Sequence, residues 1–234
     1  MHILAWNFEF APRRGKALPV LKDRYAATNA DIGILSEVRA DAMPDGHAIF
    51  ASPDWAYSAH PQARKISLVS KSPWRNVHTP RSGRPLEGRL VSGVTNAEGQ
   101  DCLVIGMCIP WSFCHVTSGQ RDSERWQEHK AFLAALPDEL GPVLETDLPV
   151  ILGGDFNHTF PRARTNEAAH AMVSDFLARF DLKLATEAPP FEGRLLNHIA
   201  VRGATAGSLT RIENMSGGNQ LTDHIGVVAR LCLP

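Results

Sequence analysis

The chain has 234 residues, which suits one substantial domain or two small ones. Its 44% hydrophobic and 21% charged content excludes a disordered or fibrous protein, and a formal net charge of −1 gives no bulk attraction to nucleic acid. No apolar run approaches the ~20 residues of a membrane-spanning helix. Since the N-terminus also lacks the pattern of a secretory signal, we expect a cytoplasmic protein.

The first half of the chain predicts mainly short strands. Apolar residues at helical spacing predict one helix over residues 18–28. Apolar runs bounded by glycine, proline and aspartate predict strands over residues 2–8, 31–38, 48–50, 55–60, 65–70, 88–95 and 102–109. A turn at residues 96–100 joins the last two.

The second half of the chain adds two helices, predicted over residues 122–136 and 166–180. Short strands are predicted over residues 197–202, 208–212 and 224–231. Because strands cluster on both sides of the helical stretches, we expect one domain over residues 1–234, an α/β fold with two packed sheets and helices outside.

Cysteines are sparse and irregularly spaced, at Cys102, Cys108, Cys114 and Cys232. These spacings match no CxxC zinc or redox pattern, and two of the cysteines lie in a predicted buried strand. We therefore expect reduced, mostly structural thiols rather than disulfides.

The stretch over residues 148–160, LPVILGGDFNHTF, is the most informative one. Its apolar run lacks alternation, as in a strand buried on both faces, and Gly153 and Gly154 are predicted to end that strand. The following loop carries Asp155, Asn157 and His158. In layered α/β folds, ligands usually bind at this carboxyl edge of the sheet.

Other predicted strand ends carry similar polar groups. These are Asn7 with Glu9, Glu37, and Asp223 with His224. Carboxylates at the ends of apolar strands are unfavourable unless they are paired or bound to a metal. Oxygen ligands of this kind suit Mg²⁺ or Mn²⁺, and a histidine can hold a proton near neutral pH. Together they predict hydrolysis of a phosphate ester.

Five motifs in order resemble the endonuclease/exonuclease/phosphatase superfamily. They are AWNFE (5–9), LSEV (35–38), GGDFN (153–157), LNHI (196–199) and LTDHIGV (221–227). The superfamily includes apurinic endonucleases, pancreatic-type deoxyribonucleases, inositol polyphosphate 5-phosphatases and bacterial sphingomyelinases. The resemblance spans nearly the whole chain and implies a four-layered α/β sandwich, which agrees with the pattern of predicted strands.

The resemblance also implies roles for individual residues. Glu37 would be the principal ligand of Mg²⁺ (or Mn²⁺), with Asn7 as its neighbour and Asp223 as a second carboxylate. Asp155 would orient or deprotonate the attacking water, and Asn157 would hold a phosphate oxygen. His224 would bind the scissile phosphate and stabilise the charge that builds on it.

Two positions depart from the family pattern. Asn197 stands where members commonly have an aspartate that pairs with the catalytic histidine. An amide can orient the imidazole but cannot stabilise its protonated form, so we expect weaker activity or activity that falls off at lower pH. Cys108, in GMCIPW, stands where many members have histidine, and we interpret it as a small buried residue. GxxIPW resembles a bacterial branch of the superfamily, and His115 is a less favoured source of the missing imidazole.

Basic residues outnumber acids seven to one between residues 61 and 91. The basic residues are Arg64, Lys65, Lys71, Arg75, Arg81, Arg84 and Arg89. A solvated surface explains most of them, and Arg89 is the one that we expect to bind substrate because its strand runs toward the site. Arg162 and Arg164 follow the GDFN loop and are candidate clamps for a phosphate. Trp111 either stacks on a base or sugar or caps the core.

The sequence thus predicts a Mg²⁺-dependent phosphodiesterase or nuclease, monomeric and without membrane contact. The chain lacks the long insertions with which larger nucleases grip a duplex, so nucleic acid ends, single strands or small phosphoesters are the expected substrates. One alternative is a phosphomonoesterase acting on a small phosphorylated metabolite. Another, which the two departures favour, is a phosphate-binding protein of the same fold with weakened catalysis.

Overall fold

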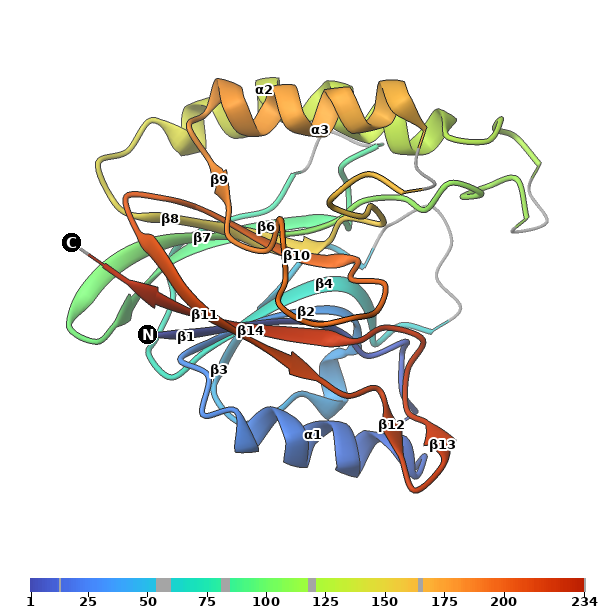
Figure 1. The fold of residues 1–234 in the computed structure, drawn as a ribbon, viewed down its shortest axis with the longest axis vertical. Coiled ribbons are helices and arrows are strands. Elements are labelled where there is room, and N and C mark those ends of the chain that lie inside the picture. Colours follow the sequence, from blue (N-terminus) through green and yellow to red (C-terminus); the bar gives the residue numbers. More distant parts are fainter. Residues whose placement is uncertain (13, 54–59, 81–84, 118–120, 164–165, 234) are drawn as a thin grey trace.

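A computed structural model describes the chain except residues 13, 54–59, 81–84, 118–120, 164–165 and 234. Two mixed six-stranded sheets pack face to face, and the helices lie on their outer faces (Figure 1). The predicted α/β sandwich is therefore confirmed. The predicted strand over residues 55–60 falls almost entirely outside the described residues.

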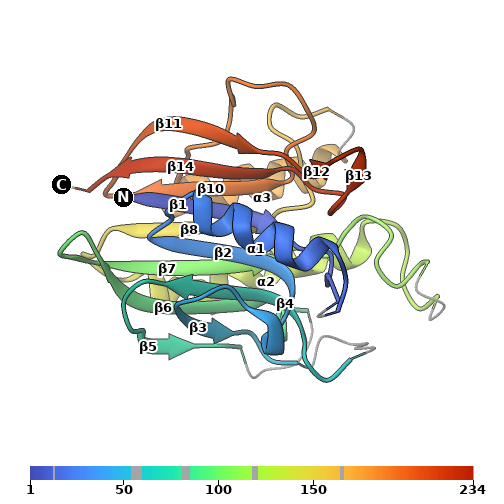
Figure 2. The same cartoon turned by 90° about the horizontal axis from the view of Figure 1, so that it is seen from below.

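The first sheet has the strand order β11-β14-β1-β2-β4-β3. Its strands are β1 (His2–Asn7), β2 (Ile32–Arg39), β3 (His47–Phe50), β4 (Ala63–Ser70), β11 (Thr205–Ile212) and β14 (Gly226–Cys232). A short 3₁₀ helix, Ala40–Ala42, follows β2. The helix α1 (Ala17–Ala27) covers the outer face of this sheet (Figure 2).

The second sheet has the order β5-β6-β7-β8-β10-β9. Its strands are β5 (Arg75–His78), β6 (Leu90–Ala97), β7 (Gln100–Cys108), β8 (Val150–Asp155), β9 (Lys183–Leu184) and β10 (Asn197–Arg202). The helices α2 (Gln127–Leu144) and α3 (Glu167–Arg179) cover its outer face (Figure 1). A two-stranded hairpin, β12 (Met215–Ser216) and β13 (Asn219–Gln220), precedes β14.

The interface between the sheets forms the main apolar core. Its fully buried side chains include Ile34 of β2, Ile66 of β4, Val104 of β7 and Ile199 of β10. Burying each such side chain away from water contributes roughly 1.5–3 kcal/mol to the free energy of folding. This burial fixes the two sheets against each other, and with them the strand ends that carry the polar residues.

The predicted end of the strand at the two glycines is wrong. Gly153 and Gly154 lie inside β8, which continues to Asp155. β7 and β8 are parallel neighbours with Met107 opposite Gly154, and a Cβ on Gly154 would stand 2.1 Å from the Met107 carbonyl oxygen. Gly154 also has a φ of +125°, which favours glycine. The glycines therefore permit a close strand approach, and Asp155 is held by the sheet itself.

The helix predicted over residues 122–136 also has different bounds. α2 begins at Gln127, directly after Trp126, whose φ of +70° is not helical. It then continues through Pro137 to Leu144. The helix passes this proline because Leu136, Leu140 and Leu144 extend its buried stripe at four-residue spacing.

Several smaller features complete the comparison with the predicted elements. The second helix is confirmed, and Asn166 caps it by accepting a hydrogen bond from the Ala169 N–H at 3.2 Å. The short edge strands β5 and β9 and the β12–β13 hairpin were not predicted. The four cysteines, all among the described residues, form no disulfide. Within the described ranges, every helix is too short or too polar to cross a membrane.

Candidate active site

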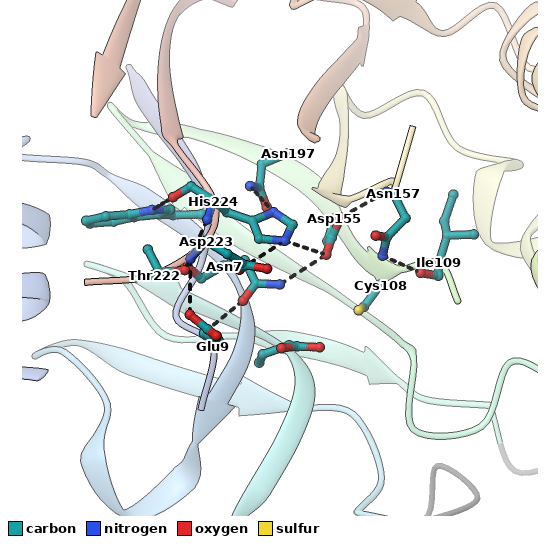
Figure 3. Close-up of polar contacts among 12 residues, drawn as sticks. Asn7, Glu9, Cys108, Ile109, Asp155, Asn157, Asn197, Thr222, Asp223 and His224 are labelled. Atoms are coloured by element: carbon teal, nitrogen blue, oxygen red, sulfur yellow. Dashed lines mark hydrogen bonds and ion pairs between the residues drawn. The ribbon is translucent and has the colours of Figure 1, made fainter. Parts of the chain in front are cut away.

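The polar residues predicted from the sequence meet at one edge of the two sheets (Figure 3). Asn7 ends β1 and Asp155 ends β8, one from each sheet. β14 runs antiparallel to β1, and β10 runs antiparallel to β8, so the residues at their starts come to the same edge. These residues are Asn197, which begins β10, and Asp223 and His224, which precede β14.

Asp155 lies at the centre of this group and is 1% exposed. Its Oδ2 accepts a hydrogen bond from Asn7 Nδ2 at 3.0 Å, and its Oδ1 accepts one from the Asn157 N–H at 2.9 Å. Burial raises the pKa of Asp155; His224 and the two hydrogen bonds oppose this rise, and the charge of Glu37 adds to it. Asp155 is therefore a fixed carboxylate that is more basic than an ordinary aspartate.

His224 lies between Asn197 and Asp155 (Figure 3). Asn197 Nδ2 donates to the Ile225 carbonyl at 3.2 Å and lies 3.3 Å from His224 Nδ1. Since the amide nitrogen can only donate, His224 Nδ1 accepts, and the neutral ring carries its proton on Nε2. Nε2 lies 3.9 Å from Asp155 Oδ2 and 3.4 Å from Asp223 Oδ1. The neutral imidazole therefore presents a donor to the centre.

The segment before β14 is locked onto β1. The Thr222 hydroxyl donates to the Asn7 carbonyl at 2.9 Å, and Trp6 Nε1 donates to the His224 carbonyl at 2.9 Å. Both bonds are buried. They hold His224 in place from residues more than two hundred positions away in the sequence.

Glu9 and Asp223 form the exposed side of the centre. The Asp223 N–H donates to Glu9 Oε2 at 3.1 Å, and the Glu9 N–H donates to Asn7 Oδ1 at 2.8 Å. Burial, followed by the charge of Asp223, raises the pKa of Glu9. Glu37 also raises it, which places the Glu37 carboxylate within electrostatic reach of both Glu9 and Asp155.

Glu37 has a partner that sequence reasoning missed. Lys65 Nζ on β4 donates to Glu37 Oε1 at 2.6 Å. Lys65 belongs to the run of basic residues between residues 61 and 91, most of which were expected at a solvated surface. Its pairing depends on the register of β2 against β4, for which the amino-acid pattern holds no signal.

The oxygen-rich donor set fits a hard divalent cation in chemistry and in charge. It comprises the carboxylates of Glu9, Glu37 and Asp223 and the amide of Asn7. Among the described residues, however, no three histidine, cysteine, aspartate or glutamate side chains already stand at metal-binding distances. Side chains would therefore have to close on a bound ion, and Glu37 would have to share its carboxylate with Lys65 or release it.

Cys108 and Arg89 lie beside the centre. Burial, with a contribution from Asp155, raises the pKa of Cys108 to about 12, so its thiol is neutral at physiological pH. Arg89 is 6% exposed and donates to the Cys108 carbonyl at 3.4 Å and to Cys114 Sγ at 3.6 Å. Its positive charge is thus buried next to the strand ends, and its binding to a substrate stays a prediction.

A pocket of about 700 Å³ opens beside Asn157. Its lining includes Trp111, Phe113, Arg125, Trp126, Phe160 and Arg194. Trp111 is 45% exposed, which excludes the interpretation of this residue as a core cap. The Arg125 guanidinium lies over the Phe113 ring at 4.5 Å, and such an aromatic and basic lining suits a flat ring that carries a phosphate.

Other candidates lie away from the centre. Arg162 is exposed and is not part of this pocket lining, whereas Arg164 falls outside the described residues, as do Arg81 and Arg84. Lys71 pairs with Asp31 at 2.8 Å and Arg75 with Asp101 at 2.5 Å, both at the surface. His115 Nδ1 lies 3.4 Å from Asp122 and 3.5 Å from Glu128, which engages this imidazole near the start of α2.

Neither a family model nor a curated protein matches this chain. Solved structures do match over its whole length. An endonuclease/exonuclease/phosphatase from Beutenbergia cavernae is 17% identical with a TM-score of 0.66, over 100% of this chain and 71% of that one. A mannosyl-6-phosphatase from Bacteroides thetaiotaomicron is 14% identical with a TM-score of 0.65, over 100% of both chains.

A third match is the 3′-5′ exonuclease NExo from Neisseria meningitidis. It is 17% identical with a TM-score of 0.71, over 98% of this chain and 99% of that one. The same Neisseria protein, described as a 3′ phosphatase bound to a product DNA hairpin, matches with a TM-score of 0.73. At these identities the shared property is the fold.

Proposed function

We propose that this chain, which has the fold of the endonuclease/exonuclease/phosphatase proteins, is a metal-dependent phosphoesterase that prefers phosphodiesters at nucleic acid ends or in single strands. The observation that carries this proposal is the buried Asp155 carboxylate. It is held by Asn7 and Asn157 and lies 3.9 Å from His224 Nε2, at an edge where both sheets end. Buried polar groups in this arrangement are typical of a catalytic centre.

Asp155 is the residue suited to activate water. Two hydrogen bonds fix the carboxylate, and its raised pKa makes it a better proton acceptor than an exposed aspartate. A water placed against Asp155 for in-line attack would lose its proton to this carboxylate. The negative charge that the attack builds on the phosphoryl group then has to be stabilised.

His224 and Asn157 are the donors suited to that charge. Asn197 directs the His224 Nε2 proton toward the centre, where it can meet a phosphoryl oxygen. Asn157 Nδ2 donates one hydrogen to the Ile109 carbonyl at 2.9 Å and has a second hydrogen for a phosphate oxygen. Glu37, Asn7 and Asp223 would hold Mg²⁺ or Mn²⁺, which supplies Lewis-acid neutralisation of phosphate charge when it is bound.

The pocket beside Asn157 favours, as substrate, a phosphodiester that carries a nucleic acid base. Aromatic residues such as Trp111 and Phe113 line it together with Arg125, and stacking on such rings binds bases with little sequence preference. The second candidate function is that of a phosphomonoesterase, which the name of the mannosyl-6-phosphatase neighbour favours. The third is a phosphate-binding protein with weakened catalysis, favoured by Asn197 in place of a carboxylate.

The test is hydrolysis of bis(p-nitrophenyl) phosphate, p-nitrophenyl phosphate and a single-stranded oligonucleotide, with Mg²⁺, Mn²⁺ or EDTA. We expect turnover that requires the metal, prefers the diesters and is lost in Asp155→Asn and His224→Ala. Asp31→Asn, which removes a surface charge paired with Lys71, is the matched control and should retain activity. A preference for the monoester would select the second candidate, and tight phosphate binding without turnover the third.

A further inference from the structure

Lys65 is a buried cation in contact with the residue expected to be the main metal ligand. Its side chain belongs to β4, is 8% exposed as a whole residue, and places Nζ 2.6 Å from Glu37 Oε1. Lysine is almost never buried unless it is paired. The ion pair therefore has a reason to exist at this place, and the proposed function leaves it unexplained.

The sheet itself brings Lys65 and Glu37 together. β2 and β4 are antiparallel, with Ser36 opposite Ile66 and Val38 opposite Arg64. Glu37 and Lys65 are thus the intervening pair. Glu37 has a φ of +50°, an uncommon backbone conformation for a residue with a Cβ. Such a strained backbone conformation is typical of functional sites.

The charge of Lys65 acts on groups that belong to both sheets. Its ammonium lies 5.0 Å from the Phe10 ring, which belongs to the loop after β1. It also lowers the pKa of Cys108, the last residue of β7, while Asp155 and Glu37 raise that pKa. Lys65 therefore stands among the carboxylates of the centre and not at its periphery.

We propose that Lys65 is the resident cation of this site: it holds Glu37 in position without metal and weakens the binding of a divalent ion, which has to share Glu37 with the ammonium or displace it. The proposal rests on the proposed function only in taking Glu37 as a metal ligand. A positive charge beside the ion repels it, and the carboxylate oxygen that the ammonium occupies is not free to coordinate. Lys65 is accordingly a positioning residue that sets metal affinity.

The experiment is calorimetric titration of Mn²⁺ into wild-type protein, Lys65→Met and Lys65→Arg, without any ester present. We expect Lys65→Met to bind Mn²⁺ about 10-fold more tightly, because one nearby positive charge is gone. Lys65→Arg keeps the charge and should bind like wild type. Equal or weaker binding by Lys65→Met would overturn the proposal, and so would failure of all three proteins to bind Mn²⁺.

Two further variants show whether the effect runs through Glu37. In the double variant Glu37→Gln with Lys65→Met, the gain in Mn²⁺ affinity should disappear. Lys71→Met removes a lysine just after the same strand, where it pairs with Asp31, and should leave Mn²⁺ affinity unchanged. A gain of the same size in Lys71→Met would reduce the effect to overall charge and overturn the proposal.

Thermal unfolding covers the case in which Lys65→Met folds poorly. Removing Lys65 leaves the Glu37 charge without its ammonium partner, so the metal-free variant should melt at a lower temperature. Saturating Mn²⁺ should then raise its melting temperature by more than it raises that of wild type. A smaller or equal metal-induced rise would contradict the proposal.

The two proposals fail separately. If no ester is hydrolysed but Lys65→Met binds Mn²⁺ more tightly, the proposed function falls and the role of Lys65 stands. If hydrolysis requires the metal but Lys65→Met has wild-type affinity, the proposed function stands and the role of Lys65 falls.

Discussion

Two polar regions inside this molecule differ in charge: one contains ionised side chains in contact with each other, and the other consists of neutral histidines. The candidate active site keeps charged groups close together, with Lys65 against Glu37 and amide donors around Asp155. The second region, here called the histidine cluster, comprises His129 of α2, His158, His170 of α3 and His198 of β10. It lies directly beyond the GDFN motif, since His158 follows Asn157 in the chain.

The histidine cluster is neutral and packed. The His158 ring stacks on His170 at 5.0 Å and on His129 at 5.9 Å, with His158 Nε2 2.8 Å from His170 Nδ1. Burial first, and then the neighbouring histidines, lower the pKa of His158 to about 3. Burial lowers the pKa values of His129 and His198 to about 4. These imidazoles therefore act as uncharged packing groups.

The difference corrects one sequence interpretation. His158 was grouped with Asp155 and Asn157 as a polar group of the ligand-binding loop. In the structure its side chain is buried against His129 and His170 instead of facing the centre. A histidine directly after the GDFN motif is thus part of the support for α2 and α3, and it is neutral because burial disfavours its charged form.

The largest effect is expected from removing the charge of Asp155 in the candidate active site. Asp155→Asn removes the proton acceptor, so kcat should fall by about 10²–10⁴-fold. The melting temperature should stay the same or rise, because the variant no longer buries a group whose charged form is disfavoured. Steady-state kinetics with thermal unfolding tests this, and a large loss of stability would show that the carboxylate is mainly structural.

The histidine cluster should make the protein sensitive to acid. The unfolded histidines bind protons near pH 6.5, whereas folded His129 and His198 do so only near pH 4. The unfolded state then binds more protons below pH 6.5, so stability should fall as pH drops from 6.5 toward 4. The slope is at most about 1.4 kcal/mol per pH unit for each histidine.

Urea unfolding at several pH values measures this slope. His198→Gln should flatten it by the share of one histidine, while His47→Gln, at an exposed position, should leave it unchanged. An equal response of both variants would assign the acid sensitivity to groups outside the cluster.

Trp111 contrasts with the buried rings of the histidine cluster because it is exposed at the pocket. Trp111→Ala should raise KM for a single-stranded oligonucleotide by about 10-fold, since stacking of one base contributes about 1–3 kcal/mol. The kcat with saturating substrate should change little. An unchanged KM would remove the pocket from the substrate path.

The smallest effect on activity is expected from replacing the neutral amide of Asn197 by a carboxylate. Asn197→Asp places a carboxylate against His224 Nδ1 and favours the charged ring, a stronger donor than the neutral one, so activity should rise by about 3-fold at low pH and lose this gain as pH rises. It also loses the donor to the Ile225 carbonyl, so stability should drop by about 1–3 kcal/mol. A wild-type profile in this variant would show that Asn197 does not limit catalysis.

Local sequence was enough to determine most of the central strands, the polar residues near their ends and the class of fold. The apolar runs at residues 2–8, 31–38 and 197–202 predicted β1, β2 and β10 closely, because buried strands need continuous apolar residues. The polar residues that follow β1 and β8 could be grouped because strand ends of layered sheets meet at one edge. The edge strands β5 and β9 escaped prediction because short strands carry too few residues to show a period.

Tertiary structure alone decided the partners of the charged groups. The pairing of Lys65 with Glu37 depends on the register of two strands, and the neutrality of His158 depends on burial under two helices. The proton position on His224, which precedes a strand of the first sheet, follows from its contact with Asn197 of the second sheet. Register, burial and the donor opposite a ring nitrogen all arise between residues distant in the chain, so no local pattern encodes them.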